Sequence, residues 1–362
     1  MNRNEMYRSE MNKNEMYRSE MRTSETPENR KRTIRFLTSA MMLIAVVVIC
    51  FNSVVGLASS LFTDTGTYTS GDAVIDKPVH NLQIDWVSGV VHIAYHKENT
   101  IEIREQAKKS IPKDKRMQWK LDGDTLQIRY EKPGLHLFST TSQEKELTVT
   151  LPEGSILGDV IIDATSGTLD IPAIQAENLS LDVTSGDIEA AVQAKKATCK
   201  STSGAIHLQI TGDAEEIITQ TTSGDIQVEG ENVNKMQAET TSGKIDIHLD
   251  KADILDASST SGNIKANVSE AGQVKTNSTS GNEEVSLSTF DTLSMDATSG
   301  DLKAALSTEP GFRASLEMLS GDLSYDLPLT KQGKEYICGD GSGKVTMETT
   351  SGNIMLTTID EG

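Results

Sequence analysis

The feature that most constrains the fold of this chain is a Ser-Gly pair, usually Thr-Ser-Gly, that recurs about every 19 residues. Ten copies have their serines 18 to 21 residues apart, with one final gap of 31, and Ser88-Gly89 is an outlying upstream copy. A fixed period of this length predicts repeating units that pack only against their neighbours. The ten serines are Ser166, Ser185, Ser203, Ser223, Ser242, Ser261, Ser280, Ser299, Ser320 and Ser351.

The residues on either side of each pair alternate between apolar and polar. Positions 2, 4 and 6 before the serine are apolar or small, as in Leu179–Val183, and so are positions 3, 5 and 7 after it, as in Ile206–Ile210. This period predicts strands with one buried face. Each unit therefore consists of two short strands, a glycine corner and a second, polar corner. Stacked at about 4.8 Å per strand, these units predict an all-β β-solenoid, or a flattened sandwich-like version of it.

The scarcity of aromatic residues agrees with a narrow coil. Only 15 of the 362 residues are Phe, Tyr or Trp, and none lies between Ser139 and Thr289. The interior of such a coil has room for Ile, Leu, Val, Ala and Thr, whereas a ring would push the two walls apart. Aromatic residues return on both sides, at Trp119 to Phe138 and at Phe312 to Tyr336. A solenoid needs atypical ends to cover its core, so both zones are interpreted as caps rather than ligand pockets.

The N-terminal region has the charge pattern of a membrane anchor. Residues 1–35 carry nine basic and six acidic side chains, a charge of +3, which leaves −22 for the rest of a chain whose net charge is −19. No charged residue occurs from Phe36 to Thr63, and Leu37–Leu57 is long enough to span a bilayer. Because basic residues flank its N-terminal side, the positive-inside rule places the N-terminus in the cytoplasm and the remainder outside the cell membrane.

A cleaved signal peptide is the alternative interpretation of this segment. Small residues at Gly56 and Ala58 have the spacing that signal peptidase recognises. The long charged region before the apolar stretch and the length of that stretch favour a retained anchor. A lipoprotein is disfavoured because Ile49, before Cys50, occupies a position that requires a small residue.

These patterns predict six regions. They are a basic cytoplasmic tail with a duplicated decapeptide (1–35), a transmembrane anchor (36–60), a linker (61–78), an N-terminal β cap region (79–155), β-solenoid repeats (156–330) and a C-terminal repeat and cap (331–362). The cap region includes a hairpin of Met117–Leu121 and Leu126–Tyr130 joined through Asp122-Gly123.

The sequence predicts no catalytic, cofactor-binding or metal-binding residue and no cofactor. It contains no phosphate-binding loop and no Gly-x-Ser-x-Gly elbow, and the repeated serines are too numerous to be nucleophiles. A strongly acidic chain is also a poor match for nucleic acid. Acidic residues at some glycine corners could form a weak column for cations, but solvated turn residues are the preferred interpretation. Those residues are Asp187, Asp225, Asp301 and Asp322, and the histidines, also interpreted as structural surface residues, are His80, His92, His96, His136, His207 and His248.

Three residues inside the repeats need separate interpretation. Glu283 occupies a position that is Ile, Leu or Val in other repeats, and because an unpaired buried charge is costly we expect a local bulge that turns it outward. A functional buried carboxylate is the alternative. Cys199 lies at an inward position, where a free thiol behaves as a small hydrophobe. About seven coils, roughly 33 Å, separate it from Cys338, too far for a disulfide.

The corners and flanking strands resemble a known bacterial family. The motifs that carry the resemblance are Thr184–Ile188, Thr222–Ile226, Leu147–Pro152, and Gly339–Val345 with Thr350–Ile354. They are similar to the bacterial "putative adhesin" β-strand-repeat domain of unknown function over about residues 79–359. Together with the N-terminal segment they resemble membrane-anchored LiaG-type proteins linked to cell-envelope stress in Firmicutes. The resemblance implies a surface-exposed β-solenoid on a Gram-positive cell and supplies no catalytic residues.

The function expected from the sequence is non-enzymatic binding outside the cell membrane, as an adhesin or a cell-envelope stress component. The partner would be an extracellular or envelope protein, a wall polymer or a cationic peptide attracted by the acidic ectodomain. Two alternatives stay open. One is a polysaccharide-processing β-helix enzyme, which the lack of aromatic platforms disfavours, and the other is a transmembrane regulator or sensor with a short cytoplasmic tail.

Overall fold

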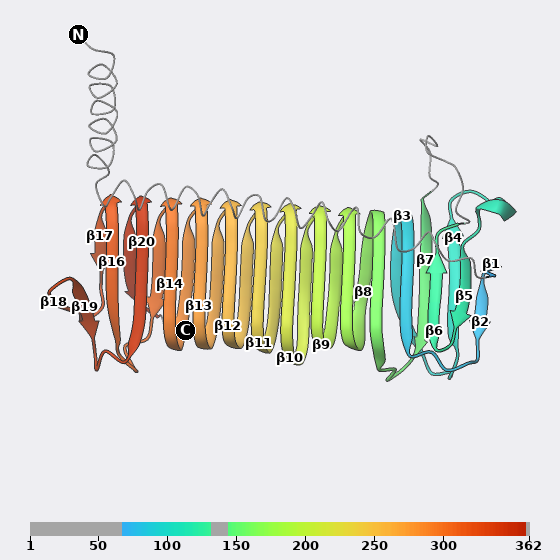
Figure 1. Cartoon of the computed structure of the whole chain (residues 1–362), viewed down its shortest axis with the longest axis horizontal. Helices are drawn as coiled ribbons and strands as arrows, with labels where there is room; N and C mark the ends of the chain where they lie inside the picture. Colours follow the sequence, from blue (N-terminus) through green and yellow to red (C-terminus); the bar gives the residue numbers. More distant parts are fainter. Residues whose placement is uncertain (1–66, 132–143, 360–362) are drawn as a thin grey trace, which may run out of the picture. The chain divides into compact units, whose positions relative to one another are not determined.

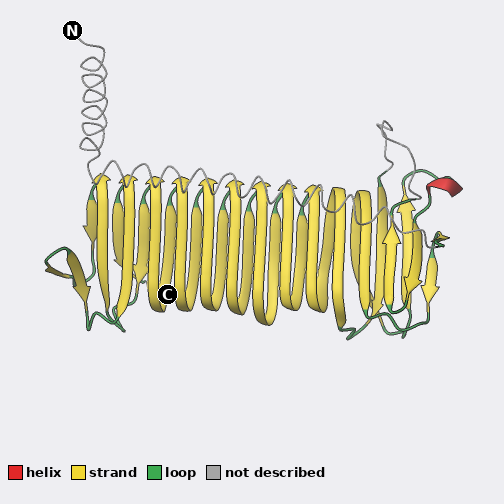
Figure 2. Cartoon of the chain, viewed as in Figure 1, coloured by secondary structure: helices red, strands yellow, loops and turns green. Residues whose placement is uncertain are grey.

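The structure is a computed structural model that describes residues 67–131 and 144–359, all within the compact unit Ile49–Gly362. Strands account for most of it, and η1 (Lys113–Lys115) is the one helical turn in these ranges (Figure 2). No helix among these residues has the length and apolar character needed to cross a membrane. The predicted tail at 1–35 and the predicted transmembrane anchor at 36–60 lie outside the described residues.

Seven long strands form the regular part of the stack, one coil beside the next in chain order (Figure 1). Neighbouring strands are parallel and in register, so that corner serines align, for example Ser223 with Ser242 and Ser242 with Ser261. The all-β, solenoid-like fold predicted from the repeat is therefore confirmed. The strands are β8 (Leu157–Ser185), β9 (Ile188–Ser203), β10 (Ile206–Ser223), β11 (Ile226–Ser242), β12 (Ile245–Ser261), β13 (Ile264–Ser280) and β14 (Glu283–Ser299).

Each coil has two walls, which we define by their position relative to the corner serine. The pre-corner wall comprises positions 6 to 2 before it, and the post-corner wall comprises positions 3 to 7 after it. In β11 and β12 the predicted inward residues Met236, Ala238, Ile245 and Ile247 are all buried. This confirms the alternation expected from the sequence, and stacking the buried faces produces one continuous core.

Glycine is required at the corner because the backbones of neighbouring coils approach each other closely there. Gly243 has φ +155°, and a Cβ built on it would lie 1.9 Å from the carbonyl oxygen of Gly224 in the preceding coil. L-residues rarely adopt this conformation, and no side chain fits at that distance. The corners therefore stack more closely than any other residue type allows.

Side chains next to the glycine link each corner to its neighbour. The Asp225 carboxylate accepts a hydrogen bond from the Lys244 amide at 2.8 Å, and Asn263 and Asn282 form the same contact with the next coils. The Thr240 hydroxyl donates to the Gly224 carbonyl at 3.3 Å. These contacts are the physical reason for the hydroxyl and Asp/Asn residues at the corner.

The stack does not follow chain order at its ends. The first repeat, β3 (Asn81–His96), pairs with β8 on one edge and with β6 (Thr125–Arg129) and β7 (Lys145–Pro152) on the other. The last repeat, β20 (Gly343–Ser351) and β21 (Ile354–Thr358), is inserted between two earlier ones. On one side lie β14 and β15 (Leu302–Leu306), and on the other lie β16 (Phe312–Ser320) and β17 (Leu323–Tyr325).

Antiparallel strands cover the N-terminal end and part of the C-terminal end. At the N-terminal end β4 (Ile101–Ala107) pairs with β7, β5 (Gln118–Asp122) forms the predicted hairpin with β6, and β2 (Ala73–Ile75) and β1 (Thr69–Ser70) lie outside them. At the C-terminal end β19 (Glu335–Cys338) pairs with β16, and β18 (Thr330–Gln332) pairs with β19. Such strands protect sheet edges that would otherwise be open to other chains.

A buried polar cluster joins the strands of the N-terminal cap. The Lys145 ammonium donates to the Glu105 carboxylate at 3.2 Å and to the Tyr130 carbonyl at 2.6 Å, and it lies 3.7 Å from the centre of the Tyr130 ring. Trp86 packs edge-on against Tyr130, and its indole N–H donates to the Lys145 carbonyl. Because Lys145 and Glu105 are both buried, the cap depends on keeping this pair intact.

Candidate binding face

The outward side of the post-corner wall carries two shallow depressions in line along the stack. The first lies over β8 to β11 and has a volume of about 420 Å³. The second lies over β11 to β14 and has a volume of about 570 Å³. Glu229 lines both of them. The two depressions therefore form one polar surface, which we call the post-corner face.

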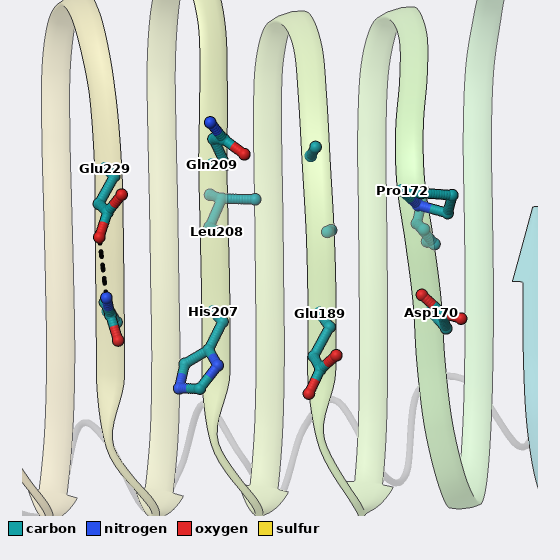
Figure 3. Close-up of a pocket in the computed structure, with 11 residues that line it drawn as sticks. Asp170, Pro172, Glu189, His207, Leu208, Gln209 and Glu229 are labelled. Carbon is teal, nitrogen blue, oxygen red and sulfur yellow. Dashed lines mark hydrogen bonds between the residues drawn. The ribbon is translucent and has the colours of Figure 1, made fainter.

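Four successive strands supply the side chains of the first depression. Asp170, Glu189 and His207 are register partners on β8, β9 and β10, so they form one row across the strands (Figure 3). Glu229 lies on the next coil and accepts a hydrogen bond from Gln227 at 2.9 Å. The small Ala191, which also lines the depression, leaves space between the longer side chains around it.

The second depression has smaller and more neutral side chains. His248 and Asp250 line it on β12, and small serines on β13 and β14 complete it. His248 contacts Asp246 at 2.9 Å and Asn267 at 3.2 Å. The side chains are polar and solvent-accessible, a lining suited to a polar ligand lying across the coils rather than to a buried small molecule.

Electrostatically the post-corner face is negative. Among the described residues that line the two depressions there are four carboxylates, those of Asp170, Glu189, Glu229 and Asp250, and no lysine or arginine. The Asp170 carboxylate contacts His92 at 2.8 Å. Glu189, Glu229 and Asp250 are exposed, so their charges act on molecules in solution.

The pre-corner wall carries acidic residues of a different kind. Asp85, Asp163 and Asp182 come from three adjacent coils and are partly buried. Burial, together with the neighbouring Asp182 and Asp85, raises the pKa of Asp163 to about 7. Burial also raises the pKa of Asp85, opposed by Arg129, and of Asp182, opposed by Lys200. Burial therefore opposes ionisation along this row, and Asp163 is only partly ionised at neutral pH.

The histidines, all interpreted from the sequence as structural surface residues, lie in different surroundings. His207 and His248 line the two depressions, whereas His96 binds the Thr100 carbonyl in the N-terminal cap. His136 lies outside the described residues. Nowhere in ranges 67–131 and 144–359 are three or more His, Cys, Asp or Glu side chains arranged to hold a metal ion.

The corner carboxylates and the cysteines have structural surroundings. Asp187, Asp225 and Asp301 each accept a backbone N–H from the adjacent coil. Cys199 and Cys338 are both buried and free, and burial raises the pKa of the Cys199 thiol to about 12. A thiol with that pKa is a poor nucleophile at neutral pH.

The prediction that Glu283 turns outward is wrong. Its side chain is 1% exposed and pairs in register with Ile264 and Leu302, with no bulge. The Thr276 hydroxyl donates to one carboxylate oxygen, and the other oxygen is buried without a hydrogen-bond partner. Burial raises the pKa of Glu283 to about 7, although the neighbouring Thr276 and Ser278 oppose this rise. A raised pKa keeps the carboxyl group partly protonated at neutral pH, which lowers the cost of leaving it in the core.

The Lys145–Glu105 pair was not anticipated from the sequence. Both residues lie in short strands where a charged residue normally faces solvent, and the repeat does not extend to them. The one available signal was the position of Lys145 two residues before the apolar alternation of Leu147–Leu151, which places it on the inward side of β7.

Several known proteins are similar to this chain. Two solved structures are described as a "putative cell adhesion protein" from Clostridium sporogenes (11% identity, 80% of this chain and 100% of that chain, TM-score 0.18) and a "putative adhesin" from Bacteroides fragilis (13%, 82% and 98%, 0.30). A third is described as a "putative lipid binding protein" from Parabacteroides distasonis (14%, 80% and 97%, 0.31). No curated protein matches the chain. The model of one family, Toastrack DUF4097, matches residues 79–291, and the chain belongs to this family.

Proposed function

We propose that this chain is a membrane-anchored, extracytoplasmic binding protein of the cell envelope, and that the post-corner face binds a polycationic ligand. The observation that carries the proposal is the pair of aligned depressions lined by carboxylates without a lysine or arginine among their described residues. Adhesion or sensing of envelope stress, as in the LiaG-type proteins it resembles, would use such a face without catalysis.

The shape of the face favours a linear ligand over a compact one. The depressions are shallow and follow each other along the stack, so a chain-like molecule would contact several coils at once. Each exposed carboxylate contributes little alone in water, but several contacts on one ligand act together. The ligand class supported by this arrangement is a polymer or peptide with repeated amino or guanidinium groups.

The proposed location rests on the sequence. The uncharged stretch from Phe36 to Thr63, with basic residues before it, is expected to hold the chain in the cell membrane with its acidic solenoid outside. There the solenoid would meet cationic peptides and amine-bearing polymers. Digestion of intact cells with an added protease tests this: the solenoid should be cleaved while cytoplasmic markers survive. A solenoid protected until lysis would contradict the orientation.

The binding proposal is tested with fluorescein-labelled decalysine and the purified full-length protein. We expect saturable binding that weakens steeply with salt, because the attraction is between exposed charges. A variant with Asp170→Asn, Glu189→Gln and Glu229→Gln should bind at least tenfold more weakly.

The matched control removes the same charge elsewhere. Glu98, Glu144 and Glu309 are exposed carboxylates outside both depressions, and changing all three to Gln should alter the affinity less than twofold. Equal weakening by the two triple variants would contradict a specific site, because net charge alone would then explain the binding.

A further inference from the structure

The C-terminal end of the stack leaves one glycine corner without a coil beyond it. The outer edge of β16 pairs with β19 only over Phe312–Ser315, and β17 pairs with β21 alone among the described strands. From Met318 to Tyr325, the end of β16, the corner and β17 therefore have no strand on their outer edge among the described residues. We call this segment the open corner.

The inner corners show which groups of such an edge form hydrogen bonds with the next coil. At one inner corner the amides of Gly224 and Ile226 donate to carbonyls of the next coil at 3.0 and 2.8 Å. The Asp225 carboxylate accepts the next coil's Lys244 amide at 2.8 Å. The equivalent groups at the open corner are the amides of Gly321 and Leu323 and the exposed carboxylate of Asp322, and no described coil lies beyond them.

Apolar side chains are also uncovered at this end. Tyr325 occupies the position of the fully buried Ile247 but is 47% exposed, and it is held by edge-on packing against Tyr336 at 5.9 Å. Leu319 is 51% exposed and Met355 on the adjacent strand is 41% exposed. Three of the seven exposed large hydrophobic residues of the described chain therefore surround the open corner. An exposed edge with apolar side chains is a typical site for strand addition.

We propose that the open corner binds an extended peptide segment from another protein, which adds one further coil to the stack. Both arms of the segment would pair with the free backbone edges, and its apolar residues would cover Tyr325 and Leu323. The segment needs a glycine at its bend, because a Cβ at each stacked corner would lie 1.8 to 2.0 Å from a carbonyl oxygen of the coil before it. The surface thus selects an apolar, glycine-containing β-arc.

A second copy of this chain fits the open corner poorly. The opposite end of the stack, which could continue it head to tail, is covered by β1 and β2. A tail-to-tail contact would bring the exposed Asp322 and Asp326 carboxylates of both copies onto one small surface, and like charges at an interface are unfavourable. The partner is therefore a different chain with neutral or basic residues beside its glycine.

The test uses a synthetic peptide that copies one repeat, residues 236–249, labelled with fluorescein and titrated with purified full-length protein. We expect saturable binding, and at least a tenfold loss when Gly243 of the peptide is replaced by Ala. Tyr325→Asp in the protein should cause a similar loss. Ile254→Asp, a matched control at a residue 44% exposed elsewhere on the stack, should leave the affinity unchanged.

A second variant separates a loss of binding from a loss of folding. Asp322→Ala removes a carboxylate for which no hydrogen bond is found within the described chain, so it should melt like the unaltered protein while binding the peptide more weakly. Absence of binding by folded protein, or equal binding of the glycine and alanine peptides, would overturn the proposal. A dimer that Tyr325→Asp dissociates would also overturn it, by making a second copy the occupant.

Discussion

Replacing Gly243 with alanine tests the physical basis of the whole stack. The new Cβ would lie 1.9 Å from the Gly224 carbonyl oxygen and 2.6 Å from its carbon, so the two coils cannot keep their spacing at this corner. The clash is with backbone rather than with a flexible side chain, and the corner must therefore open.

The expected cost has two parts. Holding alanine at φ +155° costs about 1–3 kcal/mol. Opening the corner also weakens the Gly224–Ser242 and Lys244–Asp225 hydrogen bonds, at about 1 kcal/mol each. We expect a total loss of about 3–5 kcal/mol in the free energy of unfolding, a large share of a typical domain's stability of about 5–15 kcal/mol.

Urea unfolding followed by circular dichroism measures this loss. The control is Gly123→Ala in the β5–β6 turn, where φ is +63° and no atom lies within 4 Å of the added Cβ. That change should cost only about 1–2 kcal/mol, the usual price of a left-handed conformation for an L-residue. A Gly243→Ala protein no less stable than Gly123→Ala would refute the argument that backbone contact fixes glycine at the corner.

Three further predictions concern side chains inside the stack. Ala205→Asn should add the missing corner contact to the Asp225 amide and raise stability by about 1 kcal/mol, whereas an unchanged unfolding midpoint would mean that the corner contacts contribute nothing. Glu283→Gln should change how stability depends on pH. Because burial raises its folded pKa to about 7, the unaltered protein should lose stability between about pH 4 and 7, and the variant should be more stable by about 3 kcal/mol at pH 8 but not at pH 4. Equal differences at both pH values would contradict a protonated Glu283. Lys145→Met should cost about 3–5 kcal/mol by leaving Glu105 buried without its partner, and adding Glu105→Gln should recover part of that loss in thermal melts; a double variant as unstable as the single one would contradict this coupling.

The repeating part of the fold was predictable because the residue pattern within each repeat specifies which side chains face inward and where the corner lies. The two-residue alternation placed Met236 and Ile247 inward, and the repeated Ser-Gly pair placed Gly243 at a corner. The order of the coils at the ends was not predictable in the same way. Every repeat offers nearly the same edge to its neighbours, so nothing in the motif distinguishes the inserted β20 from β16 as the partner of β14.

The candidate face was less predictable than the fold. The alternation showed that Glu189, His207 and Glu229 point outward, but not that small residues such as Ala191 leave depressions between them. Glu283 was misjudged because burial was treated as a cost to an ionised group, whereas the carboxyl group can remain in the core by keeping its proton.

The most direct test of the proposed function is to map where a polycation attaches. Carbodiimide joins an amine to a carboxylate only when the two are in contact, so decalysine can be linked to the full-length protein and the linked residues found by mass spectrometry. We predict links concentrated at Asp170, Glu189, Glu229 and Asp250, which line the two depressions. Links spread evenly over the acidic surface, or gathered on the pre-corner wall, would contradict the post-corner face as the binding site.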